Sequence, residues 1–150
     1  MAVQEVASKL GAVDLFHGLS PRVLKQIAES GHVAKFGAGT AVISEGDSVR
    51  GFKAFSPEGV EMHVILDGSV VVRVHGAQVA TLGAGAYFGE LSLVDGGPRT
   101  ADVVAGPESV TTFALPKWTF DTLLQKHPEM AVPMLKVLCD RLRRAEAERR

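Results

Sequence analysis

The sequence predicts an α+β fold: an antiparallel β jelly-roll barrel (a double-stranded β-helix) flanked by N-terminal and C-terminal helices. Two observations predict it. Residues 32–115 hold short valine-rich apolar runs separated by glycine-containing turns, whereas residues 3–30 and 117–150 carry apolar side chains at helical spacing. Turns this close together favour an antiparallel barrel over alternating strand–helix–strand units.

The first block, residues 3–30, predicts two helices. Gly11 is a suitable end for the first helix, and a hydroxyl cap followed by a first-turn proline, Ser20-Pro21, predicts the start of the second. Gly31 then ends the second helix. The apolar faces comprise Val3, Val6 and Leu10 in the first helix and Val23, Leu24, Ile27 and Ala28 in the second.

The middle block, residues 32–115, predicts seven strands. Valine is dense in these runs, as a pleated surface prefers. Two stretches do not fit the strand rhythm: residues 49–60, which we interpret as a long loop, and residues 88–99. The predicted strands are 32–36, 40–44, 61–66, 69–75, 78–82, 100–105 and 109–115.

The last block, residues 117–150, predicts two further helices with a break at His127-Pro128. Pro133 falls in the first turn of the second, whose apolar stripe comprises Met134, Leu135, Leu138 and Leu142. Such a stripe is too apolar for a free helix, so it needs a cover, for which the barrel mouth is the nearest candidate. The tail carries five arginines against three acids, a local charge of +2, which is typical of a solvated helix end; a nucleic-acid contact is the alternative.

Length and composition bound the function. The 150 residues, 46% of them hydrophobic and 22% charged, predict one globular domain over 1–150. The balance of 16 basic and 17 acidic residues excludes a generally basic nucleic-acid-coating protein. No apolar run approaches the roughly 20 residues of a membrane span, and no signal peptide precedes the first helix. We therefore expect a cytoplasmic protein.

The irregular segment 87–101 carries the chemistry. Gly89 to Ser92 can start a short helical turn whose first N–H groups lack intrahelical partners and can bind an anion. A turn at 96–98 returns the chain, so that Arg99 can act as a bidentate phosphate clamp. Glu90 adds an acceptor suited to a sugar hydroxyl. Together these features predict a site for a nucleotide with a single phosphate.

The same segment closely resembles the phosphate-binding cassette of cyclic-nucleotide-binding domains, as in protein kinase A regulatory subunits, cyclic-nucleotide-gated channels and the catabolite activator protein. The family pattern, F-G-E-[LI]-x-L-x(4)-P-R-[AST]-A, is matched in order and spacing by residues 88–101. The resemblance extends to residues 15–20, 36–47 and 64–68. It differs at residues 48–60, where the family usually has a shorter connection, so contacts around this loop are not carried over.

The resemblance implies a role for each cassette residue. Arg99 would pair with the cyclic phosphate, and the backbone N–H groups of Leu91, Ser92 and Thr100 would bind the same oxygens. Glu90, with Gly89 beside it, would accept a hydrogen bond from the ribose 2′-hydroxyl. The base would lie against apolar strand residues, and the final helix would cap it as a lid.

Four other interpretations fit the sequence less well. Arg99 and Glu90 could form a structural ion pair without ligand. The spacing of Gly83, Gly85 and Gly89 does not match a dinucleotide-binding fingerprint. A lone cysteine, Cys139, cannot form an internal disulfide or thiolate metal site, and we place it on a packing face. The histidines are widely spaced and predict no metal site; they are His17, His32, His63, His75 and His127.

These observations predict a regulatory or receptor domain, not an enzyme, because no nucleophile motif is present. The expected ligand is cAMP, needing no further cofactor; cGMP stays open, because Thr100 stands where a hydroxyl favours guanine in the family. Ligand would move the final helix to signal to a protein partner, and a homodimer through that helix is a further option. The alternatives are a ligand-free interaction module and a transcription-factor-like regulator lacking its DNA-binding domain.

Overall fold

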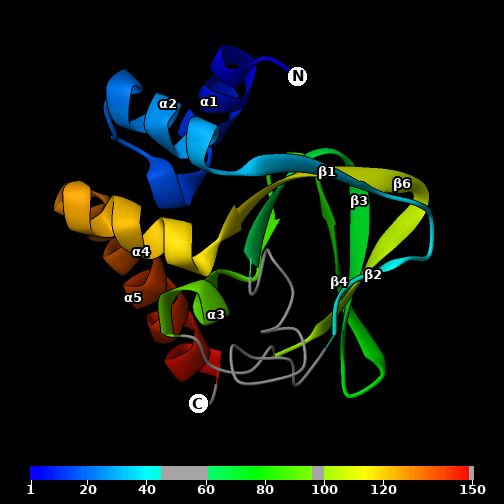
Figure 1. The fold of residues 1–150 in the computed structure, drawn as a ribbon. Coiled ribbons are helices and arrows are strands. Elements are labelled where there is room, and N and C mark those ends of the chain that lie inside the picture. Colours follow the sequence, from blue (N-terminus) through cyan, green and yellow to red (C-terminus); the bar gives the residue numbers. More distant parts are fainter. Residues whose placement is uncertain (45–60, 96–99, 149–150) are drawn as a thin grey trace.

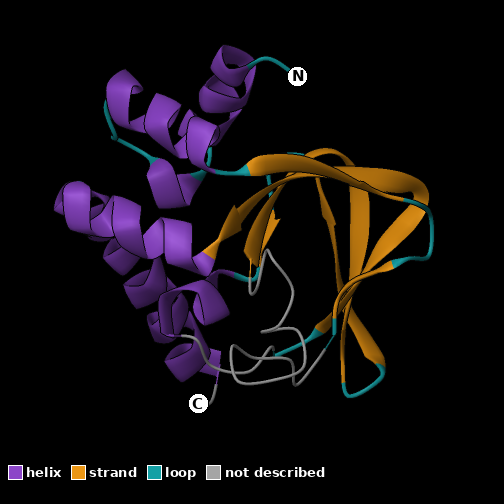
Figure 2. Cartoon of the chain, in the orientation of Figure 1, coloured by secondary structure: helices purple, strands orange, loops and turns teal. Residues whose placement is uncertain are grey.

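Helices and strands occupy opposite sides of the protein. A computed structural model describes residues 1–44, 61–95 and 100–148. In Figure 1 the helices gather at one end of a curled antiparallel sheet, and Figure 2 shows this segregation by element type. The predicted α+β barrel with flanking helices is confirmed.

The N-terminal helices begin and end where the caps predict. Helix α1 spans Val3–Gly11, a 3₁₀ turn η1 spans Asp14–Phe16, and α2 spans Pro21–Ser30. The Ser20 hydroxyl accepts a hydrogen bond from the Val23 N–H at 3.3 Å, which satisfies one of the unpaired donors of the first turn. The two helices pack together through Val6, Leu10, Val23 and Ile27.

The described strands form one antiparallel sheet in the order β1-β6-β3-β4, with β2 paired to β6 and β5 paired to β3. Strand β1 spans His32–Phe36 as predicted, and β2 spans Ala41–Ile43. Strand β4 spans Ala77–Gly83, and a two-residue strand β5, Tyr87–Phe88, leads into the cassette. The predicted loop 49–60 lies outside the described residues.

The prediction of seven strands was wrong at two predicted turns. Each of these turns is a bend within one continuous strand. Strand β3 runs through Glu61–Val74 and β6 through Asp102–Pro116, so each joins two predicted strands. The predicted turns at Gly68 and Gly106 face each other across this pair, where the register shifts between Gly68 and Val70. Gly68 has φ +84°, and Ser109 adopts φ 69°. β-Bulges at this point of β3 and β6 therefore accommodate the bend in both strands.

The C-terminal helices bury only part of the predicted apolar stripe. Helix α4 spans Lys117–Lys126, η3 spans Pro128–Met130, and α5 spans Ala131–Glu148. Met130 and Met134 enter the helical core and thereby fix the rotation of α5. Leu135 and Leu142 consequently lie 59% and 61% exposed, so the prediction that they cover the barrel mouth was wrong. Cys139, predicted on a packing face, is exposed.

Two apolar clusters form the interior, one among the helices and one in the barrel. Phe88 belongs to the barrel cluster, whereas Leu93 is fully buried in the helical cluster. The cassette therefore spans the junction between the two cores. Within the described residues, every helix is too short or too polar to cross a membrane.

The bend at Gly68 gives the first testable prediction. A Cβ at residue 68 would lie 2.3 Å from the Ser109 carbonyl oxygen, and the positive φ adds strain. We expect Gly68→Ala to destabilise the protein by about 2–5 kcal/mol, combining backbone strain and overpacking. Thermal unfolding should show this as a fall in Tm of roughly 5–15 °C.

Gly76→Ala is the matched control, because Gly76 has φ +81° but nothing within 4 Å of its added Cβ. It should carry only the backbone strain, about 1–2 kcal/mol. Equal falls in Tm for the two variants would show that the contact with Ser109 contributes nothing.

Candidate functional site

After β5, the cassette continues with a glycine in a left-handed conformation and a short helix. Gly89 has φ +83°, which side chains with a Cβ rarely adopt. Helix α3, Glu90–Asp95, follows it directly, as the predicted helical turn requires. The Leu93 N–H donates to the Gly89 carbonyl at 3.3 Å. The N–H groups of Glu90, Leu91 and Ser92 precede this first intrahelical bond, so they have no acceptor within the helix.

Helix α3 is held in place at its C-terminal end. Leu93 is 0% exposed within the helical core. The Lys117 ammonium donates to the Leu93 carbonyl at 3.0 Å and the Val94 carbonyl at 3.4 Å, and it pairs with Asp121 at 3.3 Å. A cation at the C-terminal carbonyls is favourable because it satisfies otherwise unpaired acceptors. The position of α3 is therefore fixed by core packing and by this lysine.

The cassette and the barrel enclose a cavity of about 220 Å³. Five of the six predicted site residues line it: Gly89, Glu90, Leu91, Ser92 and Thr100. The sixth, Arg99, lies outside the described residues. The opposite wall is apolar and comes from β2, β3, β4 and β6, through Ile43, Val72, Ala80, Leu82 and Val103. The cavity thus combines polar groups on one side with an apolar strand surface on the other.

Glu90 is a buried carboxylate with a basic partner. It is 8% exposed. Its Oε1 accepts a hydrogen bond from Arg141 Nη1 of helix α5, and the two groups form an ion pair. Arg141 Nη2 also donates to the Tyr87 hydroxyl at 2.6 Å, and its guanidinium lies over the Tyr87 ring at 5.0 Å from the centroid. Three contacts therefore fix one guanidinium between α5 and the cassette.

The charges in this cluster reinforce one another. Burial works against the charged guanidinium, but attraction from Glu90 and the hydrogen bond to it raise the pKa of Arg141 above its ordinary value. Burial also raises the pKa of Tyr87, and the Asp14 carboxylate of η1 raises it further. Arg141 is therefore charged and Tyr87 neutral at physiological pH.

Sequence reasoning missed Arg141, because it placed this residue in a solvated arginine tail. The prediction of a solvated end was wrong at this position. Arg141 follows Met134 by seven residues and Val137 by four, so it lies on the packed face of α5. The sequence signal that could have identified Arg141 is its spacing of four and seven residues from apolar residues that pack in the core.

The histidines near the barrel have ordinary partners. His63 is buried, hydrogen-bonded to Thr112 at 2.9 Å, and stacked on Phe88 with ring centroids 5.1 Å apart. His32 pairs with Glu61 at 2.7 Å. Across residues 1–44, 61–95 and 100–148, no three His, Cys, Asp or Glu side chains are grouped to hold a metal ion.

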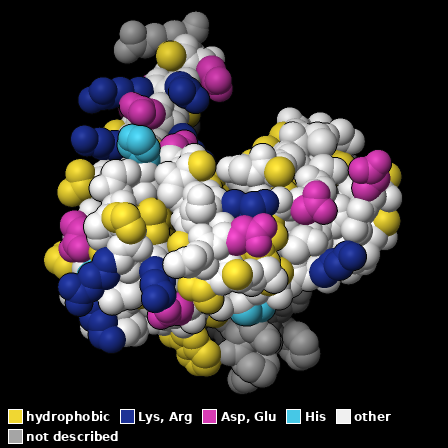
Figure 3. Space-filling model, turned by 90° about the horizontal axis from the view of Figure 1, so that it is seen from above, with side chains coloured by type: hydrophobic (Ala, Val, Ile, Leu, Met, Phe, Trp, Pro, Cys, Tyr) yellow, Lys and Arg dark blue, Asp and Glu magenta, His cyan; other side chains and the backbone are white. Residues whose placement is uncertain are grey.

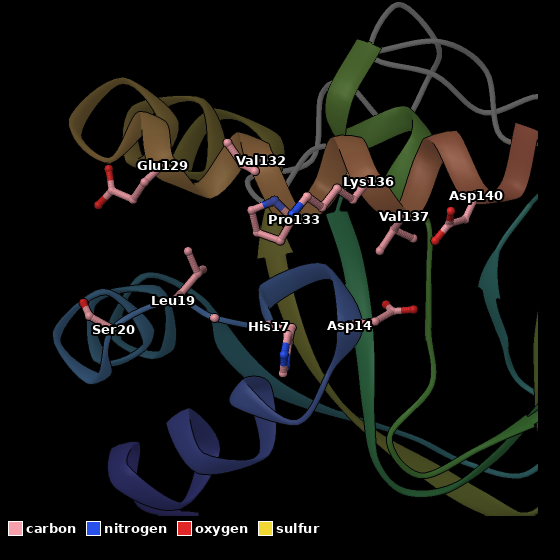
Figure 4. Close-up of a pocket in the computed structure, with 11 residues that line it drawn as sticks. Asp14, His17, Leu19, Ser20, Glu129, Val132, Pro133, Lys136, Val137 and Asp140 are labelled. Atoms are coloured by element: carbon pink, nitrogen blue, oxygen red, sulfur yellow. The ribbon is translucent and has the colours of Figure 1, made fainter.

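A larger groove, of about 710 Å³, lies between η1 and α5 and away from the predicted site residues. Figure 4 shows Asp14 and His17 on one side of it and Lys136, Val137 and Asp140 on the other. Its lining mixes charges of both signs with apolar side chains. The smaller cavity at the cassette is the candidate site, because it alone of these two brings the predicted residues together.

Comparison with known proteins agrees with this geometry. The family model described as "Cyclic nucleotide-binding domain" matches residues 33–127. A cAMP-dependent protein kinase regulatory subunit of Debaryomyces hansenii is 34% identical over 121 residues, which cover 80% of this chain and 25% of that protein. A cyclic nucleotide-gated potassium channel of Mesorhizobium japonicum is 31% identical, covering 88% of this chain and 34% of the channel.

Among solved structures, the catabolite activator protein of Thermus thermophilus superposes with a TM-score of 0.75 at 30% identity, covering 90% of this chain and 61% of that one. The chain spans about a quarter of the length of the regulatory subunit and about a third of the length of the channel. The family model covers β2 through α4 and all of β1 except His32, and this region includes the whole cassette. This chain belongs to the cyclic nucleotide-binding domain family.

Proposed function

We propose that this chain is a receptor domain for a cyclic mononucleotide, with cAMP as the preferred ligand and cGMP as the weaker one. The observation that supports it is the placement of Gly89, Glu90, Ser92 and Thr100 around one cavity whose far wall is apolar. The names of the relatives support the ligand class, since they include a cAMP-dependent regulatory subunit and a cyclic nucleotide-gated channel.

Each part of the ligand would meet a matching surface. The cyclic phosphate carries one negative charge, and Arg99 would neutralise it alongside the N–H groups of Leu91, Ser92 and Thr100. Glu90 would accept from the ribose 2′-hydroxyl. The base would lie against the apolar strand wall, where Val72 and Leu82 contribute. No chemical step follows, so the role is binding and signalling.

Helix α5 would carry the signal. It already contacts the cassette through Arg141, and η3 between Pro128 and Met130 separates it from α4. An apolar row on α5 follows a four-three-four spacing through Ala131, Leu135, Leu138 and Leu142; Leu135 and Leu142 are exposed, and Ala131 and Leu138 are half-buried. Because this spacing matches a coiled-coil seam, the row is our proposed partner surface, for a second copy or another helix.

The nucleic-acid alternative has no support on the face seen in Figure 3, where acidic and basic side chains are interspersed over helices and barrel alike. A nucleic-acid-binding protein concentrates basic side chains in one patch or stripe. We therefore retain the receptor role.

The ligand itself is tested by calorimetric titration with cAMP and cGMP. We expect saturable binding with higher affinity for cAMP, and Arg99→Glu should reduce it by roughly 30-fold to several thousand-fold, because a desolvated charge pair is lost. Arg73→Glu is the control, since Arg73 is exposed on β3. If Arg99→Glu binds cAMP as well as the unmodified protein does, the phosphate site is misassigned.

The sugar contact is tested by comparing cAMP with 2′-deoxy-cAMP. Without the 2′-hydroxyl, the buried Glu90 carboxylate loses a donor, which costs about 1–3 kcal/mol, or roughly 5- to 150-fold in affinity. In Glu90→Ala the two ligands should bind alike. Equal affinity of the unmodified protein for both ligands would exclude this role for Glu90.

Movement of α5 is tested by amide hydrogen exchange over residues 134–142. Ligand shifts the helix only if it binds one position more tightly than the other. We expect protection over this segment to rise at saturating cAMP while protection of α2 stays constant. Unchanged protection over 134–142 would contradict the proposed movement.

A further inference from the structure

Glu90 presents an electrostatic problem that the cavity alone does not solve. A buried carboxylate without a partner is strongly disfavoured and tends to take up a proton or turn toward water. The proposed ligand would not help, because its phosphate is also negative. A fixed cation beside Glu90 is therefore needed if the carboxylate is to stay charged and in place.

Arg141 supplies that cation in a way that leaves room for a ligand. Its Nη1 contacts Oε1 of Glu90. Because a carboxylate has two oxygens with about four lone-pair sites, Oε2 remains available as an acceptor. Glu90 lines the cavity, whereas Arg141 approaches from α5 and is not part of the cavity lining. The guanidinium and a ligand hydroxyl can thus occupy different oxygens of one carboxylate.

Arg141 is itself held from a second direction. The Tyr87 hydroxyl accepts a hydrogen bond from Arg141 Nη2 at 2.6 Å, and the Asp14 carboxylate of η1 raises the pKa of that hydroxyl. Figure 4 shows Asp14 on η1, on the side that faces α5. Arg141 of α5 therefore contacts both Tyr87 of β5 and Glu90 of α3.

We propose that Arg141 is a positioning residue for sugar recognition: it holds Glu90 so that Oε2 meets the ligand's 2′-hydroxyl, and the Tyr87 hydroxyl holds Arg141 in turn. This inference rests on the proposed function of the cassette. It places part of the ligand selectivity on α5, outside the cassette. It also makes the position of α5 a determinant of the discrimination between the ribose and the deoxyribose ligand.

The decisive measurement is the ratio of affinities for cAMP and 2′-deoxy-cAMP, obtained by calorimetry on the full chain. In the unmodified protein this ratio should be roughly 5- to 150-fold. In Arg141→Gln we expect cAMP affinity to fall about tenfold, because the site gains net negative charge, and the ratio to fall below about threefold, because Glu90 is no longer held. A general loss of stability would weaken both ligands without changing their ratio.

Two further variants separate positioning from charge. Tyr87→Phe keeps the ring under Arg141 but removes the hydroxyl, so it should reduce the ratio less than Arg141→Gln does. Arg141→Lys keeps the charge without the forked geometry, so it should recover cAMP affinity more than it recovers the ratio. Arg144→Gln is the matched control, since Arg144 is exposed on the same helix, and both affinities should stay within about twofold.

The outcomes are distinct. If the unmodified protein binds cAMP and discriminates against the deoxy ligand, but Arg141→Gln keeps or increases the ratio, the inference is wrong and the proposed function stands. If the unmodified protein binds neither nucleotide, both the proposed function and the inference are wrong. If Arg141→Gln does not fold, the ratios in Tyr87→Phe and Arg141→Lys decide, and unchanged ratios there overturn the inference.

Discussion

The burial of one carboxylate, Glu90, is the constraint on which the arrangement of the site depends. A charge at 8% exposure needs a partner, and the barrel wall opposite it is apolar. The partner therefore comes from outside the barrel, as Arg141 of α5. This pair joins the last helix to the cassette, and Arg141 also contacts Tyr87, whose pKa is raised by Asp14 of η1. The site is consequently assembled from both ends of the described chain.

A second constraint is that the cassette must keep a fixed position relative to Arg141. Helix α3 is only six residues long, and a helix this short is marginal by itself. Its stability comes from Leu93, which is buried among the helices, and from Phe88 just before it, which is buried in the barrel. Lys117 then binds the carbonyls at its end. A short element fixed at both ends can present backbone N–H groups without rearranging.

Much of the fold could be predicted from local sequence signals, and the departures have physical causes. Strand β1 and the cap at Ser20 follow from alternation and capping alone. Asp67-Gly68 and Gly106-Pro107 have the composition of turns, but pairing across β3 and β6 turns both into bulges, and pairing is not visible in a single segment. Five of the six residues predicted for the site line one cavity, and their binding role stays a prediction. Arg141 was missed because its role depends on the rotation of α5, which Met130 and Met134 set through tertiary packing.

The same rotation decides what holds α5 in place. The Arg141 side chain is 41% exposed, so its pair with Glu90 lies between an exposed ion pair, worth about 0.2–1 kcal/mol, and a buried one, whose disruption costs about 3–5 kcal/mol. Shifting a helix between two positions from 1:99 to 99:1 takes roughly 5.5 kcal/mol of differential affinity. The ion pair alone is too weak to account for such a shift. Met130 of η3 and Met134 of α5 are 0% and 4% exposed in the helical core, so their apolar contacts also hold α5 in position.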